Sequence, residues 1–328
     1  MYEVMVMDSP VYKRVLLKIS GEALAGEKHS GLDFGVIGSV CEAVKKCVDM
    51  GVEVGVVIGG GNFWRGVKDG EGKIERTRAD HMGMLATVMN CLAVADVMEQ
   101  HGVDVRVQTA IEMRSIAEPY IRLRAMRHLA KGRVVLFACG TGSPYFSTDT
   151  AAVLRAAEIE ADAILLAKNI DGVYTADPHI DPSATLIPRI TYAELREMAF
   201  MGASVLHEES ILPVKEKGIS LNIRNTNRPD EPGTFIVEHI ESESELERPI
   251  TGIAGRRNFT ILTVLKRNMN ASTTLCNALE ILDRYHASVE HITLGLDSFA
   301  LVVSSAALEN TLYDVIADIQ KTCRPDDV

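Results

Sequence analysis

The stretch VGVVIGGGNFWRG, residues 54–66, joins an apolar run to three consecutive glycines and then to an arginine. An apolar run that ends in glycine is typical of a strand covered on both faces and followed by a tight turn. Four more runs have similar character: RVLLKIS (14–20), VDVRVQTA (103–110), RVVLFACG (133–140) and DAILLAKN (162–169).

Amphipathic segments separate these runs, with apolar residues three and four positions apart and a glycine at the end. They are FGVIGSVCEAVKKCVDMG (34–51), ADHMGMLATVMNCLAVADVMEQHG (79–102) and PYIRLRAMRHLAKG (119–132). Alternating strands and helices predict an α/β domain with a mostly parallel sheet.

The pattern changes near residue 238, where the acidic stretch EHIESESELERP indicates a linker. Beyond it the order is strand, helix, two strands, helix, with no evident closing strand. In this second domain Leu275, Leu279 and Leu282 share one helix face that should cover the sheet. We therefore predict an N-terminal extension (1–11), a first domain (12–238), a linker (239–249) and a small α+β domain (250–328).

Composition excludes some classes of function. A net charge of −11 argues against a broad nucleic-acid-binding surface. No apolar run reaches the roughly 18 residues of a membrane span, and the N-terminus does not resemble a signal peptide. The six cysteines form no CxxC pair, which favours reduced thiols in a cytoplasmic protein over disulfides or metal ligands.

Ligands of parallel sheets bind beyond the carboxyl ends of the strands, where Gly59, Gly60 and Gly61 lie. Glycine backbone can approach phosphate closely and donate its N–H groups; a plain strand-to-helix turn is the alternative. The stretch is neither a P-loop, because Val67 and Lys68 follow it, nor a dinucleotide fingerprint, because Trp64 replaces a required glycine.

Lys18 lies inside the first apolar run and is followed by Ser20 and Gly21. A buried lysine needs an anion or a route to solvent. Its position at the same sheet edge as the glycine triplet favours phosphate, although a lysine that points to water at a strand end is the alternative.

Two further loops follow strands at this edge. The first supplies hydroxyls and amides at a helix N-terminus, where anions bind, although Thr148 or Asp149 could simply cap the helix. Its residues are Thr141, Gly142, Ser143, Pro144, Tyr145, Phe146, Ser147 and Thr148. In the second loop, AKNIDGVYTADP (167–178), Tyr174 could stack on a base and Asp177 could bind a ribose. The alternative is that its Asp-Gly and Asp-Pro turns only connect neighbouring elements.

Arg65 suits bidentate recognition of phosphate. Asp80 begins a predicted helix, so it could bind a ligand or cap that helix. We expect the apolar residues after it to pack in the core; they are Met82, Met84, Leu85, Val88 and Met89.

Residues 12–237 resemble the bacterial-type UMP kinases of the amino acid kinase family. The resemblance rests on YKRVLLKISGEAL, VGVVIGGGNFWRG, DHMGMLATVMN, GTGSPYFSTDTAA, EIEAD and DGVYTADP, which occur in this order. Residues 250–328 more weakly resemble an ACT domain, and ITGIA (250–254) is similar to the approach to the ACT repeats of aspartokinases.

The resemblance implies an αβα sandwich that binds ATP and UMP in adjacent crevices, with Mg²⁺ arriving on ATP and no dedicated protein metal site. It implies ATP contacts from Lys18, Ser20, Gly21, Gly61, Arg65, Lys168, Asn169, Tyr174 and Asp177. It implies UMP contacts from Gly60, Arg65, Asp80 and the loop from Thr141 to Thr148. Asp149 would orient Lys18, and Lys18, Arg65 and Asp149 would be the catalytic residues. The family implies a homohexamer, in which the ACT-like tails could pair.

Two other interpretations stay open. An aspartokinase-like enzyme is suggested by the ACT-like tail, but its opening motif KFGGTS is absent. A non-catalytic sensor or storage protein of the same fold would bind nucleotide without releasing ADP.

Overall fold

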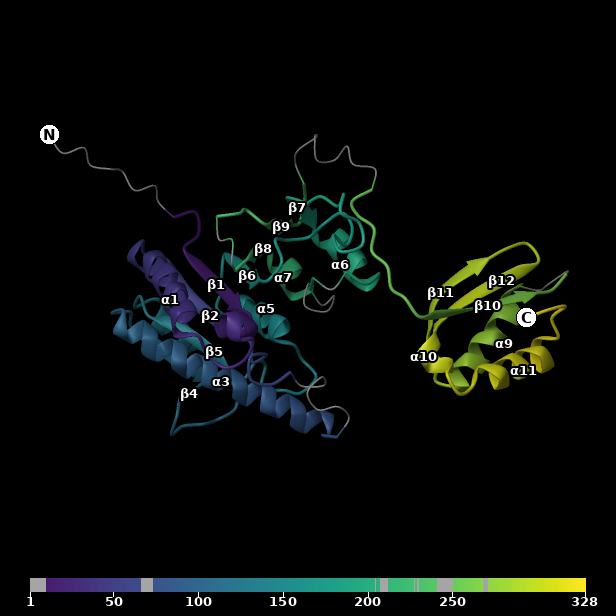
Figure 1. Cartoon of the computed structure of the whole chain (residues 1–328), viewed down its shortest axis with the longest axis horizontal. Coiled ribbons are helices and arrows are strands. Elements are labelled where there is room, and N and C mark those ends of the chain that lie inside the picture. Colours follow the sequence, from purple (N-terminus) through teal and green to yellow (C-terminus); the bar gives the residue numbers. More distant parts are fainter. Residues whose placement is uncertain are drawn as a thin grey trace. The chain divides into compact units, whose positions relative to one another are not determined.

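The structure is a computed structural model that describes residues 10–65, 73–203, 205–206, 212–226, 228, 230–240, 250–267 and 271–328. The chain forms two compact units, Met1–Ala254 and Gly255–Val328 (Figure 1). Residues 250–254, which the sequence analysis assigned to the second domain, therefore belong to the first unit. Most of the predicted linker (241–249) and of the extension (1–9) lie outside the described residues.

The first unit contains a nine-stranded sheet in the order β4-β3-β5-β2-β1-β6-β8-β9-β7. Every pair is parallel except β8 with β9, which confirms the predicted α/β class. The strands are β1 (Arg14–Ile19), β2 (Glu53–Ile58), β3 (Val105–Thr109), β4 (Glu118–Pro119), β5 (Val134–Ala138), β6 (Ala163–Lys168), β7 (Arg189–Thr191), β8 (Ser220–Asn225) and β9 (Thr234–Val237).

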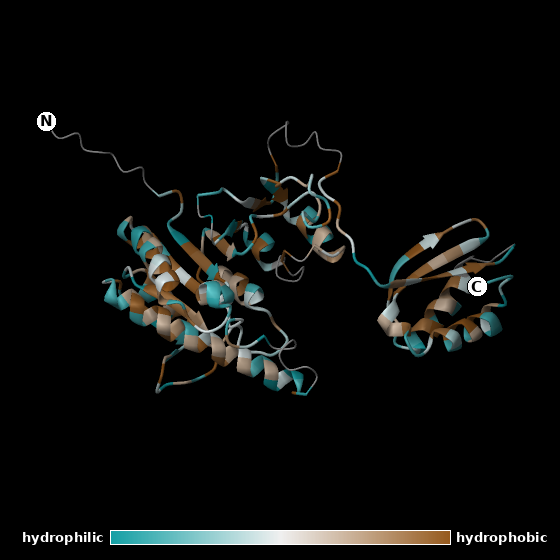
Figure 2. Ribbon diagram, in the orientation of Figure 1, coloured by the Kyte–Doolittle hydropathy of each residue, from teal (hydrophilic) through white to brown (hydrophobic). Residues whose placement is uncertain are grey.

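Helices cover both faces of this sheet, so the unit is an αβα sandwich. They are η1 (Gly21–Lys28), α1 (Phe34–Asp49), α3 (Arg76–Gln100), α4 (Arg122–Leu129), α5 (Thr148–Glu158), α6 (Tyr192–Phe200) and α7 (Leu212–Lys217). Successive residues of β1 point to opposite faces. Val15 packs in the core with α1 and α3, and Leu16 packs in the core with α4 and α5. Figure 2 shows hydrophobic residues along these strands.

Helix α3 departs from its prediction in two ways. It begins at Arg76, so Asp80 lies in the second turn and does not cap the helix. Met84 and Val88 are buried as expected, but three of the five predicted core residues face outward. Met82 is 39% exposed, Leu85 49% and Met89 51%.

Helix α3 is also long and apolar enough to cross a membrane, judged by length and composition alone. Half of that apolar stretch is buried inside the protein. Cys91, Val94 and Met98 belong to the core between α3 and the sheet. The buried half of the stretch is therefore explained by packing in the core.

Helix α5 is fixed at both ends. The Ser147 hydroxyl accepts the Thr150 N–H at 3.1 Å and caps the N-terminus, a role that the sequence analysis had given to Thr148 or Asp149 as an alternative to anion binding. Near the other end the buried Arg155 guanidinium lies 3.9 Å from the centre of the Tyr120 ring. It also donates to Glu158, which accepts from the Tyr120 hydroxyl as well. These contacts set where the first turn of α5 points.

The second unit has the predicted order of strand, helix, two strands and helix. It comprises β10 (Phe259–Leu265), α9 (Ala271–Arg284), β11 (Val289–Leu294), β12 (Ser298–Ser304), α10 (Ser305–Leu308) and α11 (Leu312–Cys323). The sheet is antiparallel in the order β10-β12-β11. Leu275, Leu279 and Leu282 of α9 pack in its core with α11, as expected.

The end of the chain returns to this sheet. Leu265 donates to the Asp327 carbonyl at 2.9 Å and accepts from the Asp326 N–H at 2.7 Å, an antiparallel bridge along the edge of β10. Among the described residues of the second unit there are thus three strands, and Asp326 and Asp327 bond to the edge of β10 without forming a fourth.

All six cysteines are among the described residues and are free thiols. Cys276 is exposed and Cys47 is partly buried. The other four are buried: Cys41, Cys91, Cys139 and Cys323. The sequence analysis had expected cysteines in apolar patterns to be buried, and four of the six are.

Candidate active site

The predicted ligand loops meet at one edge of the sheet. Strands β5, β2, β1 and β6 are consecutive neighbours and parallel, so their carboxyl ends lie side by side. The loops that follow them begin at Cys139, Gly59, Ser20 and Asn169. This is the edge at which open α/β sheets bind ligands.

Two lysines share one carboxylate at this edge. Lys18 on β1 lies two residues after Leu16 and so faces α5, where its Nζ is 2.7 Å from Asp149 Oδ1. Lys168 on β6 donates to Asp149 Oδ2 at 2.9 Å and also to the Val205 carbonyl. The sequence analysis had placed Lys168 beside the ATP nucleoside and had expected Asp149 to orient Lys18 alone. Both groups instead belong to one ion cluster.

Electrostatics keep Asp149 charged in this cluster. Burial alone would raise the pKa of the carboxyl group, but the charges of Lys18 and Lys168, and the hydrogen bonds that they donate, hold the pKa below its usual range. Two ammonium groups facing one carboxylate leave a net positive charge at this edge of the sheet.

The glycines of this edge serve packing as well as access. A Cβ on Gly21 would lie 2.4 Å from the Gly59 carbonyl oxygen, and one on Gly60 would lie 2.7 Å from the Gly83 oxygen of α3. These residues therefore let the β1 loop, the β2 loop and α3 touch. A Cβ on Gly61 would instead meet only the Glu22 side chain, at 3.3 Å.

Sequence reasoning missed a buried pair of amides beneath the triplet. Asn62 Nδ2 donates to Asn90 Oδ1 at 2.9 Å, and Asn90 Nδ2 donates back to Asn62 Oδ1 at 2.8 Å. Asn90 Nδ2 also donates to the Gly59 carbonyl, and Asn62 Nδ2 to that of Gly31. This pair fixes the β2 loop to α3. The sequence feature that could have predicted this pair is Asn90, a polar residue inside the apolar pattern of α3.

Arg65 lies over the glycine loop and is half-exposed. Its guanidinium forms an ion pair with Glu22 at 3.0 Å and donates to the Gly61 carbonyl at 3.3 Å. Glu22 was not among the predicted site residues, although it is the residue after Gly21.

Asp80 holds the loop after β5 in place. Its carboxylate accepts from Arg76 Nε at 2.9 Å and from the Tyr145 backbone N–H at 2.8 Å. Tyr145 has φ of 72°, a left-handed conformation that is costly for a residue with a side chain. Arg76, which the sequence analysis overlooked, also lies 5.2 Å from the centre of the Tyr145 ring. The structure therefore joins Asp80 to the predicted UMP loop.

The rest of this loop is held by local bonds. The Thr141 hydroxyl donates to the Ser143 carbonyl and accepts from the Ser143 N–H, both at 3.1 Å. Gly142 donates to Cys139 and has φ of 84°. Tyr145 and Phe146 present exposed rings. Pro144 and Thr148 complete the segment between β5 and α5.

The loop after β6 carries the predicted nucleoside residues. Asn169 and Asp177 are exposed and Tyr174 is partly buried. The Tyr174 hydroxyl donates to Asp171 at 3.0 Å, and Asp171 also accepts from Asn225. Asp177 caps the turn that follows it, accepting the His179 N–H.

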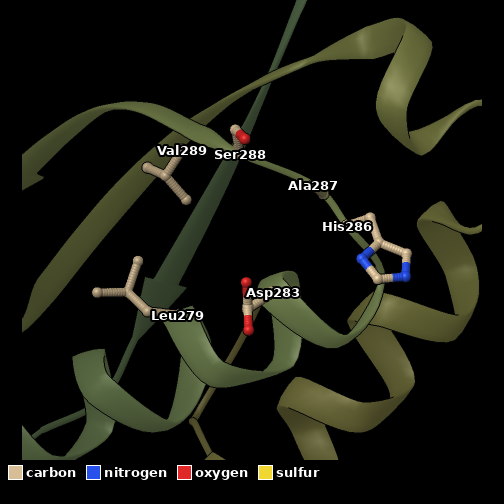
Figure 3. A pocket seen from close by; sticks show the side chains of 6 residues that line it. All are labelled: Leu279, Asp283, His286, Ala287, Ser288 and Val289. Atoms are coloured by element: carbon tan, nitrogen blue, oxygen red, sulfur yellow. The ribbon is translucent and has the colours of Figure 1, made fainter.

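No group of three or more potential metal ligands occurs in the part of the chain that the structure describes. A separate hollow of about 390 Å³ lies in the second unit, between the end of α9 and the start of β11. Figure 3 shows Asp283, His286 and Ser288 around it. It has none of the glycine turns and lysines found at the sheet edge of the first unit.

Residues 13–225 match the amino acid kinase family, and the chain belongs to that family. Two solved UMP kinases are similar to it. The Bacillus anthracis enzyme is 35% identical with a TM-score of 0.66, and the alignment covers 70% of this chain and 97% of that one. The Ureaplasma parvum enzyme is 32% identical with a TM-score of 0.63, covering 69% of this chain and 99% of that one.

A third similar structure is the aspartate kinase of Clostridium acetobutylicum. It is 23% identical with a TM-score of 0.68, and the alignment covers 95% of this chain and 83% of that one. At this identity the likeness shows a shared fold alone.

The ion cluster gives a prediction for stability. Asp149→Asn leaves the buried Lys18 and the partly buried Lys168 without a counter-charge, which should cost about 3–5 kcal/mol at neutral pH. Because the folded-state pKa of Asp149 is lowered, its contribution is present above the unfolded-state pKa of about 4 and is lost as the pH falls through the folded value. Denaturant titrations at several pH values should show that the difference in the free energy of unfolding between wild type and variant becomes smaller below about pH 4.

The control is Asp49→Asn, which removes an exposed ion pair with Lys45 and should have little effect. If the free energies of unfolding of wild type and Asp149→Asn differed by the same amount at every pH from neutral to acid, the assigned charge of Asp149 would be contradicted.

Proposed function

We propose that the chain transfers the γ-phosphoryl group of ATP to UMP, giving ADP and UDP for pyrimidine nucleotide synthesis in the cytoplasm. The observation that carries the proposal is the meeting of Lys18, Lys168 and Arg65 around glycine turns at one sheet edge. Similarity to two UMP kinases over nearly their full length supports UMP as the acceptor.

The chemistry requires positioning and charge neutralisation more than a protein nucleophile. An oxygen of the UMP phosphate attacks the γ-phosphorus, and the bond from that phosphorus to the β,γ-bridging oxygen breaks as ADP leaves. Lys18 and Lys168 would face the transferring phosphate, and Asp149 holds both in position. Arg65 would exchange Glu22 for phosphate oxygens as the substrates bind.

Mg²⁺ would enter with ATP and offset the charge of its phosphates. Both Asp149 oxygens are already bonded to lysines, so the nearest buried carboxylate suits orientation of those lysines. The ligands of the ion would then come mainly from phosphate and water, as is usual for magnesium nucleotides.

An aspartokinase-like reaction is the second candidate, because the amino acid kinase domain is followed by a small α+β unit whose order of elements resembles the ACT domains of aspartokinases. The experiment that separates the two measures ADP release with UMP, CMP, dUMP or aspartate as acceptor. Release with UMP supports the proposal, release with aspartate alone supports the second candidate, and release with neither contradicts both.

Lys18→Ala should lower turnover with UMP by about 10²- to 10³-fold, the usual effect of removing one preorganised charge. Lys168 still faces Asp149 in this variant, so folding should survive. Lys13→Ala, an exposed lysine before the same strand, is the matched control and should keep full activity. Turnover of Lys18→Ala within threefold of wild type would refute the role of Lys18.

Asp80→Ala should raise the Michaelis constant for UMP by about 10-fold or more, because the loop loses a charged hydrogen bond to the strained Tyr145. The constant for ATP should change less than twofold. Asp96→Ala, an exposed aspartate on the same helix, serves as the control. An effect on ATP alone would show that Asp80 does not belong to the acceptor side.

We further propose that the kinase unit assembles through α3, in a homo-oligomer that the family likeness suggests is a hexamer. Met82, Leu85, Met89 and Leu92 are 38–51% exposed and are spaced three, four and three residues apart. They form a stripe about 15 Å long that suits the same helix of a second copy. The C-terminal units, if ACT-like, could pair as well.

Leu85→Glu should therefore reduce the assembly mass measured by light scattering, because it buries a charge in a helix–helix contact. Leu123→Glu changes an exposed leucine on α4 and should leave the mass unchanged. An unchanged mass for Leu85→Glu would exclude this face as the contact.

A further inference from the structure

Residues 250–254, here called the strap, run along the loop expected to hold the ATP nucleoside. The Ile253 N–H donates to the Thr175 carbonyl at 2.7 Å. Thr175 lies between Tyr174 and Asp177, the two residues proposed to contact the nucleoside.

The strap bonds to a loop segment that is also paired on its opposite edge. On its other side Thr175 donates its N–H to the Thr185 carbonyl at 2.9 Å, and its hydroxyl accepts the Thr185 N–H at 3.0 Å. Tyr174 forms an antiparallel bridge with Leu186. The nucleoside loop is thus paired with residues 185–186 on one side and with the strap on the other.

The strap is also fixed at its first residues. The Thr251 hydroxyl donates to Glu194 Oε1 at 2.5 Å. The other oxygen of Glu194 accepts from Thr191 in the capping box of α6, so the strap is tied to a helix terminus. A Cβ on Gly252 would lie 2.8 Å from Met198 Cε and 3.1 Å from the Thr175 carbonyl, which shows how closely the strap backbone lies on the unit.

We propose that the strap positions the nucleoside loop for ATP, so that the donor-nucleotide affinity of the kinase unit depends on the segment that leads into the second unit. The second unit begins at Gly255, one residue after the strap ends. A displacement of the backbone at Gly255 would therefore be transmitted through Ile253 and its hydrogen bond to Thr175. The inference rests on the proposed function, because it takes ATP as the donor.

Ile253→Pro in the full-length chain removes the N–H that bonds Thr175, since proline has no such donor. Ile253→Ala is the matched control, because it keeps that N–H and loses the same side chain, which is 70% exposed. Loss of one hydrogen bond should weaken ATP binding by about 3- to 10-fold in the proline variant. The alanine variant should stay within twofold of wild type.

Thr251→Val provides a second test without proline, because valine keeps the shape of threonine and removes the bond to Glu194. It should weaken ATP binding in the same direction. ATP dissociation constants should be measured by calorimetry without acceptor, alongside the Michaelis constants for ATP and UMP and the melting temperature. We expect the UMP constant and turnover at saturating ATP to change less than twofold.

Unchanged ATP affinity in both Ile253→Pro and Thr251→Val would overturn the inference. Equal losses of affinity for ATP and for UMP, together with a lower melting temperature, would also overturn the inference, because they would indicate a general loss of structure. Failure of the wild-type chain to bind ATP would refute the proposed function itself. The two failures are therefore distinguishable by the wild-type titration.

Discussion

The site depends on one carboxylate placed between two ammonium groups. Lys18 and Lys168 lie on adjacent parallel strands, and like charges so close together are unfavourable without an anion. Asp149 supplies that anion from the first turn of α5. The helix must therefore start where Ser147 caps it and lie where Arg155 and Tyr120 hold it. A single ion cluster thus joins β1, β6 and α5 and sets the geometry of the candidate site.

Much of this arrangement could be predicted from sequence, because it follows from local periodicity. The apolar runs predicted β1, β2, β3, β5 and β6, and parallel strands bring their carboxyl ends to one edge. What periodicity cannot supply is the partner of a given side chain. The Asn62–Asn90 pair joins residues 28 positions apart, and Lys168 meets Asp149 only because β6 lies beside β1. Likewise, the apolar spacing in α3 did not reveal which of its methionines face outward.

The glycines at this edge of the sheet lie in two different kinds of surroundings. Gly21 and Gly60 are required because backbone from another segment occupies the space of a side chain. The three atoms nearest a Cβ on Gly61 instead all belong to Glu22, the partner of Arg65. The sequence presents three identical letters at 59–61, and only the packing shows that Gly60 lies against the backbone of α3 whereas Gly61 faces a side chain.

The distribution of thiols makes the protein easy to label at one place. Burial raises the pKa of Cys41 to about 11 and also raises that of Cys91, Cys139 and Cys323, so these groups are poor nucleophiles near neutral pH. Cys276 alone is exposed, on α9 of the second unit. A maleimide dye added briefly to the native protein should therefore report selectively on that unit, without any engineered cysteine.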